Sequence, residues 1–138
     1  MIPVRQTSSI LLGTVTALVA GAAAVSATGL TRPGTLSFTA VNTSALKLTT
    51  KIVIRDDDYA GKRLIGHDNL TCAYATGKCT ALFALTAGTI KARFVGSGTT
   101  GSGTVVGGTG SYSGARGSFT WRNLNASGSR TGIVITFS

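Results

Sequence analysis

Three consecutive aspartates, Asp56, Asp57 and Asp58, are the residues of this sequence best suited to chemistry. Adjacent carboxylates repel one another, which raises the pKa of at least one of them toward the range useful for proton transfer. If the run ends a strand at the mouth of a barrel, one or two of these carboxylates can act on a bound ligand. The run also starts like a calcium loop, but Ala60 and His67 occupy its fifth and twelfth positions. An ordinary solvated turn is therefore the expected structure, and no metal is predicted.

Other catalytic motifs are incomplete. His67 is the only histidine and Asp68 follows it directly, so on a strand the two side chains point to opposite faces and cannot pair within that strand. We expect His67 at the surface and no hydrolase triad. The glycines of 107–110 resemble a dinucleotide loop, but the third glycine comes one position late and no helix follows.

The two cysteines, Cys72 and Cys79, are too far apart for a C-x₂-C metal pair, and no second pair completes a zinc site. A turn over residues 74–77, with Gly77 in the left-handed conformation, places them opposite each other on antiparallel strands. Opposed strand residues lie within disulfide reach. We predict a disulfide that staples a hairpin; free thiols are the alternative.

The chain starts like an exported protein. Arg5 is the only charge before an uncharged, largely apolar run over residues 10–25, and small residues follow at Ser26 and Ala27. This order is typical of a secretory signal peptide cleaved near residue 27, and a retained membrane anchor is the alternative. We expect a secreted protein whose mature part, residues 28–138, has no membrane contact. Its predicted disulfide suits the oxidising environment outside the cell.

Composition favours strands and argues against nucleic-acid binding. The 138 residues have a net charge of +9, 19 glycines and no glutamate, and Thr, Val and Ile favour β-structure. The basic residues are scattered without interleaved aromatic residues, which excludes a specific nucleic-acid site. Loose attraction to anionic polymers at the cell surface explains the charge better.

Alternation of apolar and polar residues predicts about eight short strands, mostly separated by glycine-bearing turns. Eight strands close a small barrel filled by its own side chains or by one small ligand. The clearest strand is residues 46–55, and the aspartate run is expected to break the pattern after it. The glycine-rich segment 96–103 is expected to be a surface loop, or a loop that gates the barrel mouth. The predicted strands are 35–41, 46–55, 63–72, 79–86, 89–95, 99–106, 116–124 and 130–137.

One glycine-rich segment carries a family resemblance. Residues 105–117, VVGGTGSYSGARG, resemble the V-x-G-G-T-G-x-[FY]-x-x-A-x-G signature of dirigent proteins and their allene oxide cyclase-like relatives. The segment GKRLIG at 61–66 resembles that group's G-x-x-[IV]-G stretch. The cysteine pair, followed by Phe83-Ala84-Leu85 and Gly88-Thr89-Ile90, is similar to an exported bacterial branch. The resemblance spans roughly residues 35–137.

The resemblance implies an all-β, eight-stranded antiparallel barrel of the allene oxide cyclase/dirigent type, with an apolar lumen and a dimeric or trimeric assembly. It implies cyclisation, coupling or stereocontrol of reactive intermediates without a cofactor. Acidic residues near the cavity and an arginine near the glycine motif would assist proton transfer, which assigns catalytic roles to Asp56, Asp58 and Arg116. Tyr74 and Tyr112 complete the sparse polar set as predicted ligand-binding residues.

Two functions follow, and the orientation of Arg116 bears on both. The first is a secreted barrel that encloses a small apolar molecule, with cofactor-free isomerase or cyclase activity. The second is a non-catalytic secreted domain that binds or assembles at the cell surface. Alternation places Arg116 on the face opposite Phe119 and Trp121. We expect the aromatic face to pack outside and Arg116 to enter the lumen, near Asp56 or Asp58, because the preceding glycines can add a bulge.

Overall fold

The computed structural model describes residues 32–138. The predicted signal peptide lies outside the described residues. Within 32–138 no helix is long and apolar enough to cross a membrane.

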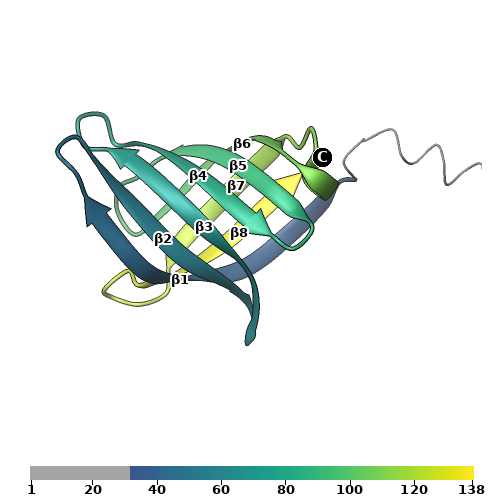
Figure 1. The fold of residues 1–138 in the computed structure, drawn as a ribbon, viewed down its shortest axis with the longest axis horizontal. Coiled ribbons are helices and arrows are strands. Elements are labelled where there is room, and N and C mark those ends of the chain that lie inside the picture. The colour runs from purple at the N-terminus through teal and green to yellow at the C-terminus, as the bar shows by residue number, and fades with distance from the viewer. Residues whose placement is uncertain (1–31) are drawn as a thin grey trace, which may run out of the picture. The chain divides into compact units, whose positions relative to one another are not determined.

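Eight antiparallel strands follow one another in sequence order and form a closed barrel, because β1 pairs with both β2 and β8 (Figure 1). This confirms the predicted all-β, eight-stranded antiparallel barrel. Closure gives every strand two hydrogen-bonded neighbours and leaves no free sheet edge. The strands are β1 (Gly34–Lys47), β2 (Lys51–Ala60), β3 (Arg63–Ala73), β4 (Lys78–Leu85), β5 (Gly88–Val95), β6 (Thr100–Gly108), β7 (Gly117–Asn123) and β8 (Arg130–Phe137).

The first hairpin differs from its prediction. The alternating run at 46–55 belongs to two strands, since β1 ends at Lys47 and β2 begins at Lys51, with the backbone N–H of Leu48 donating to the carbonyl of Lys51 at 2.8 Å. The turn contains neither glycine nor proline, and so alternation continues across it without a visible break. The aspartate run was also placed wrongly: it lies inside β2 rather than after a strand.

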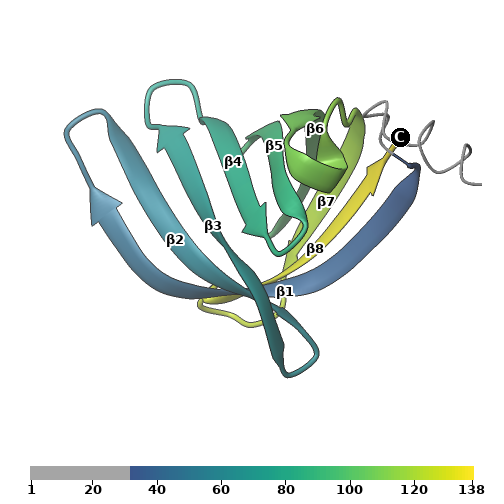
Figure 2. The same cartoon turned by 45° about the vertical axis from the view of Figure 1, so that its right-hand side comes forward.

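The barrel has one end filled by side chains. Figure 2 shows the turns after β1 and β3 on one side, and the short 3₁₀ helix η2 (Gly110–Tyr112) and the C-terminus on the other. The loops after β5 and β7 lie at the same end as the β3–β4 turn. Inward-facing residues near the η2 end pack into a hydrophobic core. Burial of their apolar surface away from water stabilises the fold. Its largest members are Phe38, Phe83, Ile90, Val105, Phe119, Ile133, Ile135 and Phe137.

The glycine signature of residues 105–117 closes this end. Gly108 approaches two backbone segments so closely that a Cβ there would lie 2.5 Å from the carbonyl oxygens of Thr89 and Tyr112. The Tyr112 ring packs edge-on against Phe137, with ring centroids 5.5 Å apart, and Ala115 is fully buried. The signature therefore ties η2 over the filled end of the barrel, where only glycine permits the close backbone approach.

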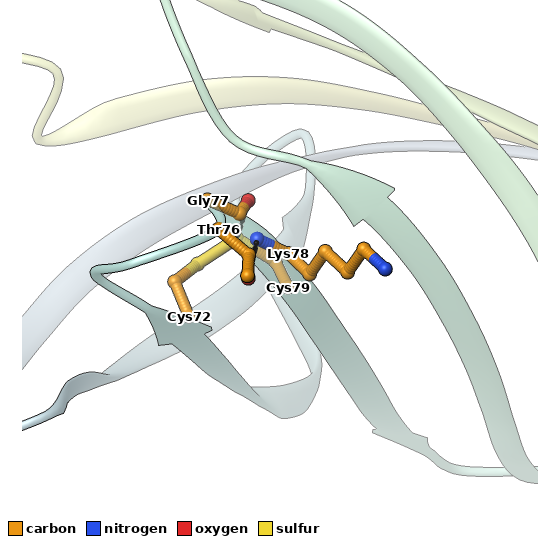
Figure 3. Close-up of a disulfide and its surroundings, with 5 residues drawn as sticks. All are labelled: Cys72, Thr76, Gly77, Lys78 and Cys79. Atoms are coloured by element: carbon orange, nitrogen blue, oxygen red, sulfur yellow. Dashed lines mark hydrogen bonds between the residues drawn. A yellow bond between two sulfur atoms is a disulfide. The ribbon is translucent and has the colours of Figure 1, made fainter.

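The predicted disulfide between Cys72 and Cys79 is confirmed (Figure 3). The two residues are paired across β3 and β4, with Cα atoms 4.0 Å apart. Gly77 has φ of 68°, the left-handed conformation the turn requires, and the Lys78 backbone N–H donates to Thr76 Oγ1 at 3.2 Å. The staple thus fixes the β3–β4 turn at the end of the barrel opposite η2.

Candidate ligand-binding and acid–base site

Strand alternation sends two of the three consecutive aspartates into the barrel. Asp56 and Asp58 lie on the inner face of β2, with exposed fractions of 7% and 0%. Asp57 points outward, where its Oδ1 lies 2.8 Å from Nδ1 of His67 on β3. His67 is at the surface, as predicted, and its partner comes from the neighbouring strand rather than from its own.

A third buried carboxyl group comes from β3. Asp68 is directly opposite Asp56 in the β2–β3 pairing and is 1% exposed. In the sequence Asp68 stands out only as the neighbour of His67, so its place in this cluster is not predicted. Pairing β2 with β3 around the predicted turn at Ala60-Gly61, followed by alternation along both strands, would have placed Asp68 beside Asp56. The three inward groups, Asp56, Asp58 and Asp68, are called the carboxyl cluster below.

Few hydrogen-bond donors reach the carboxyl cluster. Asn42 on β1, paired with Asp56, donates through Nδ2 to Asp56 Oδ1 at 3.0 Å. Both carboxyl oxygens of Asp58 and Oδ1 of Asp68 are buried, and within residues 32–138 no N–H or hydroxyl group donates to them. Two carboxylates cannot hydrogen-bond to each other, so a proton on Asp68 is what allows it to donate to Asp58 or Asp56.

Burial and mutual repulsion keep protons on the carboxyl cluster. Burial, and then repulsion by Asp58 and Asp56, raises the pKa of Asp68 to about 10. The pKa of Asp58 is raised to about 6, chiefly by burial, although a hydrogen bond with Asp68 lowers it. Burial also raises the pKa of Asp56, against the lowering effect of the Asn42 hydrogen bond. Near neutral pH the cluster therefore holds both a carboxyl group that can donate a proton and a carboxylate that can accept one.

The carboxyl cluster lies beside a cavity of about 630 Å³ inside the barrel. Asp56 and Asp68 line this cavity, while Asp58 lies deeper, among the core residues. Apolar side chains form most of the remaining wall, which is the usual composition of a pocket for a small organic molecule. They are Ala40, Ala45, Ile52, Ile54, Leu70, Ala73, Phe83, Phe94, Phe119, Trp121 and Ile133.

Aromatic rings form a continuous row along one side of the cavity. Phe83, Phe119, Phe94 and Trp121 contact one another edge to face in that order, with neighbouring ring centroids 5.3–6.3 Å apart. Such contacts favour fixed ring positions. The row gives the cavity an aromatic, polarisable wall near Asp68, which is paired with Phe83 across β3 and β4.

The mouth of the cavity is at the end with the disulfide. Tyr74, from the β3–β4 turn, and Cys72 line it, together with residues 96–98 and 127–129 of the β5–β6 and β7–β8 loops. The backbone N–H of Gly96 donates to the carbonyl of Gly77 at 2.9 Å, so the disulfide-stapled turn is bonded to the loop beside it. The glycine-rich segment predicted at 96–103 is thus a mouth loop only up to residue 99, because β6 begins at Thr100.

Only some of the predicted site residues lie together at the cavity. Asp56 and Tyr74 line the cavity, and Asp58 is inside the barrel. Tyr112 does not line the cavity; it packs against Phe137 at the opposite end.

The expected orientation of Arg116 is wrong. Arg116 is exposed, its Nη1 donates to the Ala115 carbonyl at 2.8 Å, and no carboxylate of residues 32–138 forms an ion pair with it. Phe119 and Trp121 face inward instead. Alternation holds through this segment, and the expected bulge does not reset it: Arg116 pairs with Ser138 through both backbone hydrogen bonds, next to β7.

The aspartate run also forms no calcium loop. Its members alternate between the inside and the outside of β2, so their oxygens do not converge on one point. Among residues 32–138 no group of histidine, cysteine, aspartate and glutamate side chains is arranged to hold a metal ion.

The fold defined by these strands is the eight-stranded barrel of the dirigent type. Solved structures of two kinds of protein share it. "Pyocyanin demethylase" matches with a TM-score of 0.65 at 17% identity, over 76% of this chain and 100% of that one. The pterocarpan synthase dirigent protein GePTS1 matches with a TM-score of 0.51 at 15% identity, over 78% and 86%. The corresponding protein PsPTS1 gives 0.54 at 15%, over 77% and 93%.

These likenesses concern the fold. No protein-family profile matches the sequence, and no curated protein is similar to it in sequence. The resemblance seen in the glycine signature agrees with the shared barrel, since both point to the dirigent-type fold.

Proposed function

We propose that the protein binds a small, largely apolar molecule in the lumen of its barrel and exchanges protons with it through the carboxyl cluster. One observation carries the proposal: Asp56 and Asp68 line an otherwise mostly apolar cavity of about 630 Å³. This volume suits a ligand the size of a metabolite or drug. The structural neighbours, a demethylase and two pterocarpan synthases by name, support small-molecule handling by barrels of this shape.

The chemistry best suited to the carboxyl cluster is isomerisation or cyclisation by proton transfer. The carboxylate of Asp56, which lines the cavity, takes a proton from one atom of the substrate, and the protonated Asp68 gives a proton to another. The substrate keeps its composition and the two carboxyl groups exchange their protonation states, so neither an oxidant nor a redox cofactor is required. Groups with pKa values displaced toward neutrality are efficient in such steps.

Export is part of the proposal. The Cys72–Cys79 disulfide and the apolar run at residues 10–25 support secretion, because disulfides persist mainly in oxidising compartments. Association into a dimer or trimer stays a prediction.

A second function, binding without catalysis, is favoured by the position of Arg116. The arginine that the family resemblance assigned to proton transfer is outside the barrel, and no lysine, arginine or histidine lines the cavity among the described residues. An exported carrier or cell-surface binding domain would need only the cavity. The two functions differ in whether the bound molecule leaves unchanged.

The test is the identity of molecules that purify with the protein. Wild type should carry a metabolite that mass spectrometry detects after extraction, and Ala45→Trp should lose it, because the indole would occupy the cavity that Ala45 lines. Ala84→Trp, an outward position on β4, is the matched control and should retain the metabolite. Equal recovery from all three proteins, or no enriched metabolite, would contradict lumen binding. Conversion of the metabolite to an isomer of equal mass then separates the enzyme from the carrier.

A further inference from the structure

We propose that the lumen selects organic cations: molecules with a flat apolar body and a positively charged nitrogen that meets Asp56 and Asp68. The inference rests on the proposed lumen binding and names the class of ligand. It concerns the charge of the ligand and holds whether or not the ligand is chemically transformed.

The first observation is a buried acidic side chain that faces the cavity without a partner. Asp68 is 1% exposed and lines the cavity, yet no donor from the described part of the chain reaches its Oδ1. Asp56, across the β2–β3 pairing, lines the same cavity, and among the described residues Asn42 is its one donor other than Asp68. A buried carboxyl oxygen without a donor is costly, so a ligand that places a positive charge beside it recovers part of that cost on binding.

The second observation is the separation of charge between the two faces of the barrel wall. Every lysine and arginine among residues 32–138 is exposed, and none lines the cavity. Three of the four carboxyl side chains of the chain are inside the barrel. The charged groups that face the carboxyl cluster from the neighbouring strands are therefore only its own members, with Asp57 and His67 on the outer surface. No side chain neutralises a carboxylate there, and a ligand cation would.

The third observation is the row of aromatic rings in the same cavity. Phe94, Phe119 and Trp121 line it together with Asp56 and Asp68. Aromatic faces attract cations, most strongly when water is excluded. A flat cationic heterocycle would pack its apolar body against the rings and place its charge near the carboxyl groups. A neutral molecule of the same shape would make only the contacts with the rings.

Three probes of similar shape and different charge test the inference: N-methylquinolinium, 2-methylnaphthalene and 2-naphthoate. The readout is the indole N–H resonance of Trp121, the single tryptophan of the chain, which lies at the cavity wall. Salt at about 0.15 M screens the positive outer surface. We expect the cation to bind at least about tenfold more tightly than the neutral probe, equivalent to about 1.4 kcal/mol, and the anion to bind more weakly than both.

Two variants with the same change of charge locate the effect. Asp56→Asn should reduce the affinity for N-methylquinolinium about tenfold and leave that for 2-methylnaphthalene unchanged. Asp57→Asn, one residue away but on the outer face, should alter neither. Equal binding of the cation and the neutral probe, or equal effects of the two variants, would overturn the cation inference and leave lumen binding intact. Failure of all three probes to shift Trp121 would overturn both.

Discussion

Replacing Asp68 with asparagine is expected to stabilise the barrel at neutral pH, by on the order of 3 kcal/mol. The pKa of Asp68 in the folded protein is raised to about 10 by burial and by its carboxyl neighbours, from 3.8 for an exposed aspartate. At pH 7 ionisation of this group lowers the free energy of the unfolded chain, whereas in the folded chain the group keeps its proton and gives no such stabilisation. Asparagine has nearly the shape of the protonated acid and can still donate to Asp56 or Asp58, but it has no proton to lose.

The same linkage gives the wild type an unusual pH profile. A raised pKa in the folded state makes a stabilising contribution that is fully present below about pH 4 and is lost as pH rises through the folded pKa. The contribution of Asp58 is lost between about pH 4 and 6, and that of Asp68 continues to fall up to about pH 10. Since the chain has four carboxyl side chains and three are in the cluster, we expect stability to decrease from pH 4 to pH 8.

Urea unfolding at a series of pH values measures this profile. Asp68→Asn should flatten most of it, and Asp57→Asn, which removes a carboxyl group from the outer face, should retain the decrease above pH 4. A wild-type maximum near neutral pH, with loss of stability on acidification to pH 4, would show that the cluster is ionised in the folded protein.

Replacing Phe83 with alanine should cost about 3–5 kcal/mol, because Phe83 connects the filled end of the barrel to the cavity. Its ring is 1% exposed and contacts Phe38 and Phe119 edge to face, with centroids 5.7 and 6.1 Å away. It also lines the cavity. Its removal would lose these contacts and extend the void into the core.

Leu82→Ala is the matched control for this prediction. Leu82 is the preceding residue of β4 but points outward and is 41% exposed, so its truncation should change the free energy of unfolding by about 0.5 kcal/mol or less. Thermal or urea unfolding of both variants gives the comparison. Similar small losses for the two would mean that Phe83 is not part of a packed layer beneath the cavity.

Alternation and turn residues were sufficient to predict the barrel and the disulfide. Seven of the eight predicted strands overlap one observed strand each, and Cys72 pairs with Cys79 because Gly77 permits the turn. The β1–β2 turn at residues 48–50 could not be predicted from the sequence, because Leu48 and the two threonines that follow it are ordinary strand residues. The sequence pattern there carries no signal that a strand has ended.

The site was harder to predict because it depends on pairing between strands. The mutual repulsion of the aspartates and the family resemblance point to Asp56 and Asp58, but their common inward face follows from the position of the run inside β2. Asp68 joins them only through the register of β2 against β3. Arg116 was placed inside from an expected bulge, and the continuous alternation of Phe119 and Trp121 into the core places it outside.

Titration of the aspartate carboxyl carbons by ¹³C NMR tests the central claim, that protonated and ionised carboxyl groups coexist beside the lumen. The chain has four aspartates and no glutamate, so selective labelling gives four side-chain signals that single Asp→Asn variants assign. We expect Asp68 to keep its proton well above neutral pH and Asp58 to titrate near pH 6. Complete ionisation of both groups by about pH 5 would contradict the account.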